Sequence, residues 1–392
     1  MSDSRRLRVV HVPSSVGGNP QGLSRQLREL GVDSEVWALA GNSFGYRADR
    51  ILWAPGDGLL RREWKRLRAI WAVAREFDII HFNFGTTLAE PLPLSRDADL
   101  GLGRKLKTLV NAIYRRAIFR IEIALYRLHG RSMFIHYQGD DARQGDVSLT
   151  RFKYSIAHQV GGCYYCRASD SFKRGMVRTM AQVCAQVYAV NPDLLHVLRL
   201  GARFIPYCHI QLDEWTPRFI DSAGASPLRI GHAPSHRGVK GTDLILAALD
   251  RLRSAGHAFG LDLIEGVSQD EARKRFAEVD VVVDQLHAGW YGGVAVEAMA
   301  LGKPVLVYLR EDDLQFVPEQ MRAELPFILV TPDTVEDVLL RVLAMSRSDL
   351  HALGIRSRAY VERWHDPAMI AAEILQDYQA ALSRREAPSC AA

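Results

Sequence analysis

Long uncharged apolar runs are missing from this sequence of 392 residues. No such run reaches the ~20 residues that a membrane-spanning helix needs, so we expect no transmembrane helix. The first apolar run, residues 7–13, is short and contains Arg8 and His11. It therefore indicates a buried strand and not a signal peptide. Both absences predict a cytoplasmic protein.

Cysteine is scarce as well. The five cysteines are few and odd in number, which favours a reducing compartment with free thiols. Cys163 and Cys166 have the CxxC spacing and lie between His158 and Cys184. A zinc site is one interpretation of this spacing. Because the chain has no second CxxC pair, reduced or redox-active thiols are the favoured interpretation.

Acidic residues are sparse in the first half of the chain. Residues 1–215 carry 31 Lys and Arg against 20 Asp and Glu, a net +11, whereas the remainder carries 19 against 25, a net −6. This asymmetry predicts that the first half faces an acidic partner, either a membrane surface or a polyanion. Two helical stretches, 59–71 and 102–131, set Lys and Arg among apolar side chains.

Basic amphipathic helices of this kind suit the headgroup boundary of an anionic leaflet. A solvated basic face that packs on a sheet explains the same pattern. Nucleic acid is disfavoured, because no recognised nucleic-acid-binding motif accompanies the charge. The sequence thus predicts peripheral association with an anionic membrane surface.

Short apolar segments alternate with helical segments in two series. The series define a first domain at 1–205 and a second at 228–365, with a linker rich in proline and small residues at 206–227. Residues 366–392 are expected to form a helix that packs back on the first domain, followed by a tail. The expected strands are 7–13, 35–39, 78–84, 133–137, 186–190, 228–234, 261–265, 279–286, 304–309 and 327–330. Such strands predict an α/β fold of two doubly wound, Rossmann-like domains facing a central cleft.

The segment 280–305 contains the strongest functional pattern. It predicts a buried strand, a loop and a short helix that begins after Gly292 and Gly293. Free N–H groups and the positive dipole end at a helix start bind anions, and glycine lets a diphosphate approach the backbone closely. Glu297 lies one turn further, where a carboxylate can hold two ribose hydroxyls. A tight strand–helix turn with a solvated glutamate is the alternative.

A second pattern follows the first strand of the second series. Arg237 and Lys240 lie in the loop at the carboxyl end of this strand, where open α/β sheets bind ligands. Two cations there are suited to neutralise a leaving diphosphate. The alternative is that both merely decorate an exposed turn.

Together, these segments resemble the retaining glycosyltransferase family 4 of the GT-B superfamily. The matching residues are Lys240-Gly241-Thr242, Glu297-Ala298-Met299-Ala300 and Gly302-Lys303-Pro304-Val305. The resemblance covers most of residues 7–365. It implies that Arg237 and Lys240 bind the donor diphosphate and that Glu297 holds the ribose. It also implies that the turn Tyr291-Gly292-Gly293-Val294 supplies backbone donors to phosphate and sugar.

The first half agrees with this resemblance. Gly17 and Gly18 resemble the glycine loop that faces the donor phosphates in the family. The run 136–143 resembles the stretch where the family places polar groups near the reacting sugar. Within it, His136 is the candidate contact to the transferred sugar, and Asp140 is a candidate donor-binding residue.

One position departs from the family pattern. The family pairs two glutamates separated by seven residues; the second matches Glu297, but Gly289 stands at the first. The missing acid normally helps to position the donor sugar. Gly289 remains a candidate donor-binding position, and Asp284 or His287 is expected to compensate.

The resemblance implies transfer of a sugar from a nucleotide-diphosphate sugar to a lipid-linked or surface-glycan acceptor, with retention of anomeric configuration. It implies no cofactor and no catalytic metal ion, because GT-B enzymes stabilise the diphosphate with cationic side chains and helix ends. Two alternatives stay open. One is a non-catalytic sugar-nucleotide-binding partner in glycan assembly, suggested by Gly289, and the other is a GT-B sugar-nucleotide epimerase.

Overall fold

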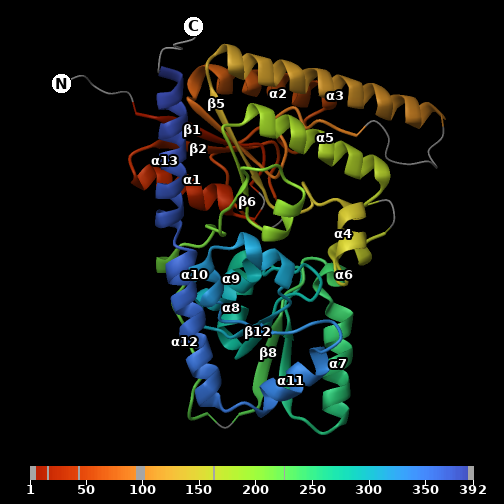
Figure 1. The fold of residues 1–392 in the computed structure, drawn as a ribbon, viewed down its shortest axis with the longest axis vertical. Helices are drawn as coiled ribbons and strands as arrows, with labels where there is room; N and C mark the ends of the chain where they lie inside the picture. The colour runs from red at the N-terminus through yellow and green to blue at the C-terminus, as the bar shows by residue number, and fades with distance from the viewer. Residues whose placement is uncertain are drawn as a thin grey trace. The chain divides into compact units, whose positions relative to one another are not determined.

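The computed structural model describes residues 6–15, 17–42, 45–93, 102–161, 164–224 and 226–386. The chain forms two compact units, each with its own parallel sheet and core (Figure 1). Unit 1 comprises Met1–Asp146, Gly162–His209 and Pro367–Ala392. Unit 2 comprises Val147–Gly161 and Ile210–Asp366.

Unit 1 is built on a parallel sheet with the strand order β3-β2-β1-β4-β5-β6-β7 in the described residues. The strands are β1 (Arg8–Val12), β2 (Asp33–Ala38), β3 (Arg50–Ile51), β4 (Ile79–Asn83), β5 (Ser132–Tyr137), β6 (Gln186–Ala189) and β7 (Arg203–Phe204). Successive side chains of a strand point to opposite faces. Val9 therefore belongs to one core and Val10 to another.

Helices cover both faces of this sheet. They are α1 (Asn19–Glu29), α2 (Leu59–Glu76), α3 (Leu102–Leu128), α5 (Arg167–Val183) and α13 (Pro367–Glu386), with the 3-10 helix η2 (Pro192–His196). Helix α4 (Gly145–Arg151) begins in unit 1 and belongs from Val147 onward to unit 2. The core around Val10 contains side chains of α2, α3 and α5. The core around Val9 contains side chains of α1 and of α13, the last helix, which packs beside α1 (Figure 1).

Unit 2 contains a shorter parallel sheet with the order β12-β11-β10-β8-β9 in the described residues. Its strands are β8 (Leu228–His232), β9 (Phe259–Leu263), β10 (Val281–Val283), β11 (Val305–Val307) and β12 (Ile328–Leu329). Its α-helices are α6 (Arg237–Lys240), α7 (Thr242–Ser254), α8 (Gln269–Glu278), α9 (Gly293–Ala300), α10 (Glu319–Ala323), α11 (Val335–Ala344) and α12 (Arg347–Trp364). The 3-10 helices are η1 (Ile156–His158), η3 (Leu212–Glu214) and η4 (Glu311–Phe316). One core joins β8, β10 and β11 to α7 and α11.

The structure confirms the expected α/β class with two parallel sheets. The strand expected at 261–265 begins earlier, at Phe259, and the two-residue strands β3 and β7 were not expected. Strands that short carry no readable alternation. The two basic stretches form α2 and α3. Among the described helices, none is both long enough and apolar enough to cross a membrane.

Candidate functional site

Lys240 lies in a sharp turn after β8, in the interior of unit 2. Lys240 ends α6, and Gly241 follows with a φ of 77°, a conformation that glycine adopts at little cost. A Cβ atom at Gly241 would lie 2.9 Å from Leu286 Cβ, so the turn also has no room for a side chain. The side chain of Lys240 is buried, with 8% of its surface exposed.

Asp284 connects Lys240 to the start of α9. It follows β10 directly, and its Oδ1 accepts a hydrogen bond of 2.6 Å from Lys240 Nζ. Its Oδ2 accepts a hydrogen bond of 2.7 Å from the backbone N–H of Gly292, the residue that caps α9. A Cβ atom at Gly292 would lie 3.2 Å from Lys240 Nζ. The ammonium group thus lies against the glycine backbone at the first turn of α9.

This arrangement suits an anionic ligand. An ammonium group has three N–H donors, and Asp284 uses one of those of Lys240. The backbone N–H groups that open a helix add further donors and a positive dipole end. The carboxylate that fixes Lys240 also occupies the Gly292 N–H. An anion bound here would therefore depend on Lys240 and on the amides of Gly293 and Val294.

His232, at the end of β8, supports this corner. Its Nδ1 lies 2.8 Å from the carbonyl oxygen of Val283, and its Nε2 lies 2.9 Å from Thr242 Oγ1. Burial lowers the pKa of His232 to about 4, so the ring is neutral near pH 7. The imidazole joins β10 to the start of α7. In the sequence, the one sign of this supporting role is that His232 lies at the end of a predicted strand.

Arg237 has different surroundings from Lys240. About half of its side chain is exposed, and its guanidinium donates two hydrogen bonds to Glu265, at 2.9 and 3.0 Å. The hydrogen bond from Arg237 lowers the pKa of Glu265. The alternative that both cations decorate an exposed turn therefore fits Arg237 but not Lys240, because the side chain of Lys240 is buried.

Glu297 lies on the inner side of α9 and is buried. Its Oε1 accepts a hydrogen bond of 2.8 Å from Gln269 Nε2, at the start of α8. A solvated glutamate, the alternative considered from the sequence, does not match this burial. Gln269 was not singled out in the sequence, where nothing marks a lone glutamine as the partner of a distant carboxylate.

Gly289 faces a guanidinium group. Its φ is 81°, and a Cβ atom there would lie 2.5 Å from both Cζ and Nη1 of Arg310. Arg310 is buried, donates a hydrogen bond of 2.6 Å to Asp313 Oδ2 and lies 3.7 Å from the ring centroid of Phe152. Its Nη2 also donates to the carbonyl oxygen of Tyr154 at 3.0 Å. The space where a side chain at position 289 would begin is filled by a cation.

We predict that Gly289→Ala destabilises the protein more than Gly256→Ala does. Both glycines have a positive φ, but a Cβ atom at Gly256 would meet nothing within 4 Å. Left-handed backbone costs an alanine about 1–2 kcal/mol at either position, and overpacking adds roughly 1–3 kcal/mol at Gly289. Chemical denaturation of the two variants measures the difference. Equal losses of stability in the two variants would show that Arg310 does not restrict position 289.

The turn 291–294 can offer its backbone but not its first side chain to a ligand. Tyr291 is fully buried, and its hydroxyl lies 2.9 Å from His365 Nε2 and 3.1 Å from the hydroxyl of Tyr360. It therefore anchors the turn in the core. Of the two expected compensators for Gly289, Asp284 contacts Lys240, whereas His287 Nδ1 lies 3.1 Å from the carbonyl oxygen of Gly238.

The candidate residues of unit 1 begin with Gly17 and Gly18, which follow β1. Their φ values are 73° and 71°, and Gly18 caps α1. A Cβ atom at Gly18 would lie 2.7 Å from the ring of Tyr46, and one at Gly17 would lie 3.2 Å from Gln138 Oε1. Both positions therefore require glycine for the turn itself, whether or not a phosphate binds there.

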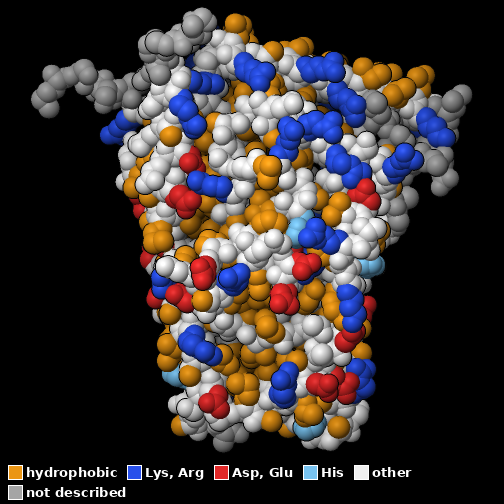
Figure 2. Space-filling view, viewed as in Figure 1, with side chains coloured by type: hydrophobic (Ala, Val, Ile, Leu, Met, Phe, Trp, Pro, Cys, Tyr) orange, Lys and Arg blue, Asp and Glu red, His pale blue; other side chains and the backbone are white. Residues whose placement is uncertain are grey.

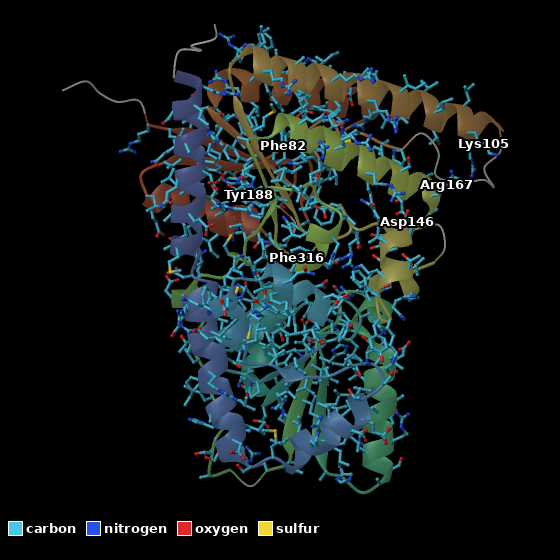
Figure 3. All side chains as sticks on the ribbon, in the orientation of Figure 1. Phe82, Lys105, Asp146, Arg167, Tyr188 and Phe316 are labelled. Carbon is cyan, nitrogen blue, oxygen red and sulfur yellow. The ribbon has the colours of Figure 1, made fainter. Side chains whose placement is uncertain are left out.

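His136 lies inside unit 1, within a row of stacked rings. Its Nδ1 and His81 Nε2 share a hydrogen bond of 2.7 Å, and the ring stacks on those of His81 and Tyr188 (Tyr188 is labelled in Figure 3). His11 stacks on the other side of His81, and the hydroxyl of Tyr378 in α13 contacts His81 Nδ1. Burial lowers the pKa of His136 to about 3. The ring is a neutral, buried group, and its contact with a sugar stays a prediction.

Asp140 is engaged by its neighbours in unit 1. It accepts hydrogen bonds from the hydroxyls of Tyr164, at 2.9 Å, and Tyr165. Arg143 lies 3.5 Å away and pairs mainly with Asp193, at 2.5 Å. The tyrosines between the two CxxC cysteines thus hold this carboxylate, a role that the motif did not signal.

The CxxC motif lies partly outside the described residues, because Cys163 is among those not described. Cys166 has a free thiol and directly precedes α5. Across the residues that the structure does describe, no group of three or more His, Cys, Asp or Glu side chains is placed to hold a metal ion.

Solved structures with the same architecture come from several glycosyltransferases. Sucrose-phosphate synthase from Thermosynechococcus elongatus is 16% identical with a TM-score of 0.61, and the match covers 97% of this chain and 100% of that one. The catalytic domain of starch synthase IV from Arabidopsis thaliana, bound to ADP and acarbose, is 12% identical with a TM-score of 0.59. The match covers 97% of this chain and 100% of that one. A glycosyltransferase from Rickettsia africae is 12% identical with a TM-score of 0.54. The match covers 96% of this chain and 99% of that one.

Comparisons by sequence give no assignment. No protein-family model matches the chain, and no curated protein sequence matches it significantly. At these identities the structural similarity establishes the fold. The chain has the GT-B fold, with two Rossmann-like α/β units.

Proposed function

We propose that the protein is a glycosyltransferase that uses a nucleotide-diphosphate sugar and binds the donor diphosphate in unit 2. The observation that supports this proposal most strongly is the buried Lys240, held by Asp284 against the start of α9. An ammonium group and helix-terminal amides are donors that stabilise negative charge on a leaving diphosphate. In our proposal, the bond between the anomeric carbon and the β-phosphate oxygen breaks, and an acceptor hydroxyl bonds to that carbon and releases its proton.

We assign the ribose hydroxyls to Glu297, which lies one turn into α9 beside Gln269. Arg237 is the second cation of the donor site, and its use for the diphosphate requires that it leave Glu265. Retention of configuration follows from the family resemblance. The proposal includes neither a cofactor nor a catalytic metal ion.

The proposed acceptor is a lipid-linked or surface glycan. The net +11 of residues 1–215 supports an anionic membrane surface beside the acceptor. A cytoplasmic, peripherally membrane-associated location is part of the same proposal. Nucleic acid is not among the proposed partners.

The test is incubation of the protein with a panel of nucleotide-diphosphate sugars, with and without an acceptor extract. Slow release of nucleoside diphosphate from one donor, accelerated by the extract, is expected of a transferase. Conversion of a donor into its epimer would instead identify an epimerase. The absence of both product release and donor binding across the panel would contradict the proposal.

A non-catalytic sugar-nucleotide-binding partner is the second candidate function. The observation that favours it is the Arg310 guanidinium, which fills the space beside Gly289 where the family has an acidic side chain. Tight binding of one donor without turnover, even in the presence of acceptor extract, would identify this function.

We predict that Glu297→Ala weakens donor binding by about tenfold or more, because a ribose-binding carboxylate makes charge-assisted hydrogen bonds. Titration calorimetry with a nucleoside diphosphate and its 2′-deoxy analogue measures this loss. If Glu297 holds the 2′-hydroxyl, removal of the hydroxyl weakens binding to the wild type but not to the variant. Equal weakening in both proteins would return Glu297 to a structural role.

A further inference from the structure

Helix α3 has two apolar faces. Its inner face contributes Ile118, Phe119, Ile123 and Tyr126 to the core of unit 1. A second row of apolar residues, spaced by three or four positions, is exposed along the whole helix. This row consists of Leu106, Val110, Ile113, Ala117, Ile121, Ala124 and Leu128. A surface helix of a globular protein normally has one apolar face, which packs on the core. The outer row of α3 is a second apolar face, and it is exposed.

Helix α2 repeats this pattern. Its inner face contributes Ala69, Ile70 and Val73 to the same core. An outer row of exposed apolar residues consists of Leu60, Trp64, Leu67 and Trp71, and Leu60 is 90% exposed. Because both helices pack on the same face of the sheet, both outer rows point away from it. The hydroxyl of Tyr114 on α3 donates a hydrogen bond of 2.9 Å to Glu63 on α2, which links the two helices.

Basic side chains flank both outer rows. The exposed basic residues of these helices are Arg61, Arg68, Arg75, Arg104, Lys105, Lys107, Arg120 and Arg127. Across the described side chains of α2 and α3, Glu76 is the one exposed acid. Figure 2 shows basic and hydrophobic side chains side by side along the edge formed by α3. The guanidinium carbon of Arg68 lies 4.5 Å from the ring centroid of Trp64, and that of Arg75 lies 5.8 Å from that of Trp71.

We propose that α2 and α3 form an interfacial membrane anchor, whose outer apolar rows enter the acyl boundary of an anionic leaflet while the basic residues contact its headgroups. This inference deepens the proposed membrane partner. Electrostatic adsorption alone would leave Leu, Ile and Trp side chains in water. Insertion of these side chains adds an attraction that salt does not screen.

Charge and surface chemistry favour a bilayer over the other possible occupants. A second copy of this chain would bring two strongly basic faces together, and like charges repel. Nucleic acid would satisfy the basic residues, but its phosphates offer nothing to a continuous row of Leu, Ile and Val. An anionic leaflet matches both features, because Trp suits the interface and Arg stems lie along apolar surface with the charge in water.

The test is co-sedimentation of the full-length protein with vesicles of phosphatidylcholine, alone or with about one third phosphatidylglycerol. Binding to the anionic vesicles is measured at about 0.1 M and about 1 M salt, where the screening length shortens to a few ångströms. The wild type is expected to bind the anionic vesicles and to keep a measurable part of this binding at high salt. The charge variant Arg68→Glu/Arg75→Glu/Arg120→Glu is expected to lose most of its binding at low salt.

The decisive variant is Trp64→Ser/Trp71→Ser, which leaves the charge unchanged. Each removed Trp is expected to lower the partition coefficient by about tenfold or more and to abolish binding at high salt. The matched control Leu244→Ser/Ile355→Ser removes two exposed apolar side chains of unit 2 and should bind as the wild type does. Thermal melting of each variant checks that it is folded.

Tryptophan quenching by lipids with brominated acyl chains reports insertion directly. Quenching in the wild type that disappears in Trp64→Ser/Trp71→Ser is the expected result. Unaltered vesicle binding by this variant, or wild-type binding that salt removes completely, would overturn the proposal. Dimerisation or DNA binding that replaces vesicle binding would also overturn it. Because vesicle binding needs no donor, its failure is distinguishable from failure of the proposed transferase activity.

Discussion

Replacement of Lys240 by alanine is expected to lower turnover by roughly a hundredfold or more, the scale of losing one group that stabilises transition-state charge. The same change should also destabilise the protein, because it leaves the carboxylate of Asp284 buried and without its cation. Loss of one partner of a buried ion pair costs about 3–5 kcal/mol. Turnover and thermal melting of Lys240→Ala measure the two effects.

The double variant Lys240→Ala/Asp284→Ala separates catalysis from stability. Without either charge, no unpaired ion remains in the core, and most of the lost stability should return. Activity should not return, because the diphosphate still lacks its ammonium partner. Recovery of turnover together with stability would show that Lys240 is only a structural residue.

Acidification is expected to unfold unit 1 sharply, because neutral histidines are buried in its sheet. Burial lowers the pKa of His11 and His136 to about 3 and lowers that of His81 well below its usual value. The unfolded chain binds protons at these sites below pH 6.5, whereas the folded chain binds them near pH 3 at His11 and His136 and only well below pH 6.5 at His81. The unfolded state therefore holds more protons between these values, and stability falls as the pH falls.

Each histidine contributes a slope of about 1.4 kcal/mol per pH unit in this window. His11→Leu is the test, because neither ring nitrogen of His11 has a hydrogen-bond partner among the residues that the structure describes. This variant should retain stability near pH 7 and unfold at a lower pH than the wild type. The control His257→Gln changes an exposed histidine and should leave the acid midpoint unchanged. An unaltered midpoint in His11→Leu would contradict the assignment, and circular dichroism across the pH range provides the measurement.

The sequence predicted the fold well because buried parallel strands are continuous apolar runs. Val281–Val283 is such a run, and Arg8–Val12 approaches it with three valines beside Arg8 and His11; both are interior strands of their sheets. The loops after β8 and β10 were also predictable, since each contains glycines: Gly238 and Gly241 after β8, and Gly289, Gly292 and Gly293 after β10. The two-residue edge strands β3 and β7 had no readable signal, because two residues cannot display a period, whereas the equally short β12 lies within the expected strand 327–330.

The pairings within the candidate site were not predictable. The sequence offers Asp284 as a substitute for the missing acid, but nothing in it indicates that Asp284 binds both Lys240 and the Gly292 amide. Arg310 was missed completely, because its approach to Gly289 depends on tertiary packing between segments distant in sequence. The sequence also left the burial of Lys240 open, and this burial now separates it from Arg237.

A crystal structure of the protein with a bound nucleoside diphosphate is the direct test of the proposed donor site at Lys240 and the start of α9. We expect β-phosphate oxygens within about 3 Å of Lys240 Nζ, the range of a charge-assisted hydrogen bond. The amides of Gly293 and Val294 should face the same phosphate, and the ribose hydroxyls should contact Glu297. A diphosphate bound away from Lys240 and the start of α9 would show that the donor site lies elsewhere.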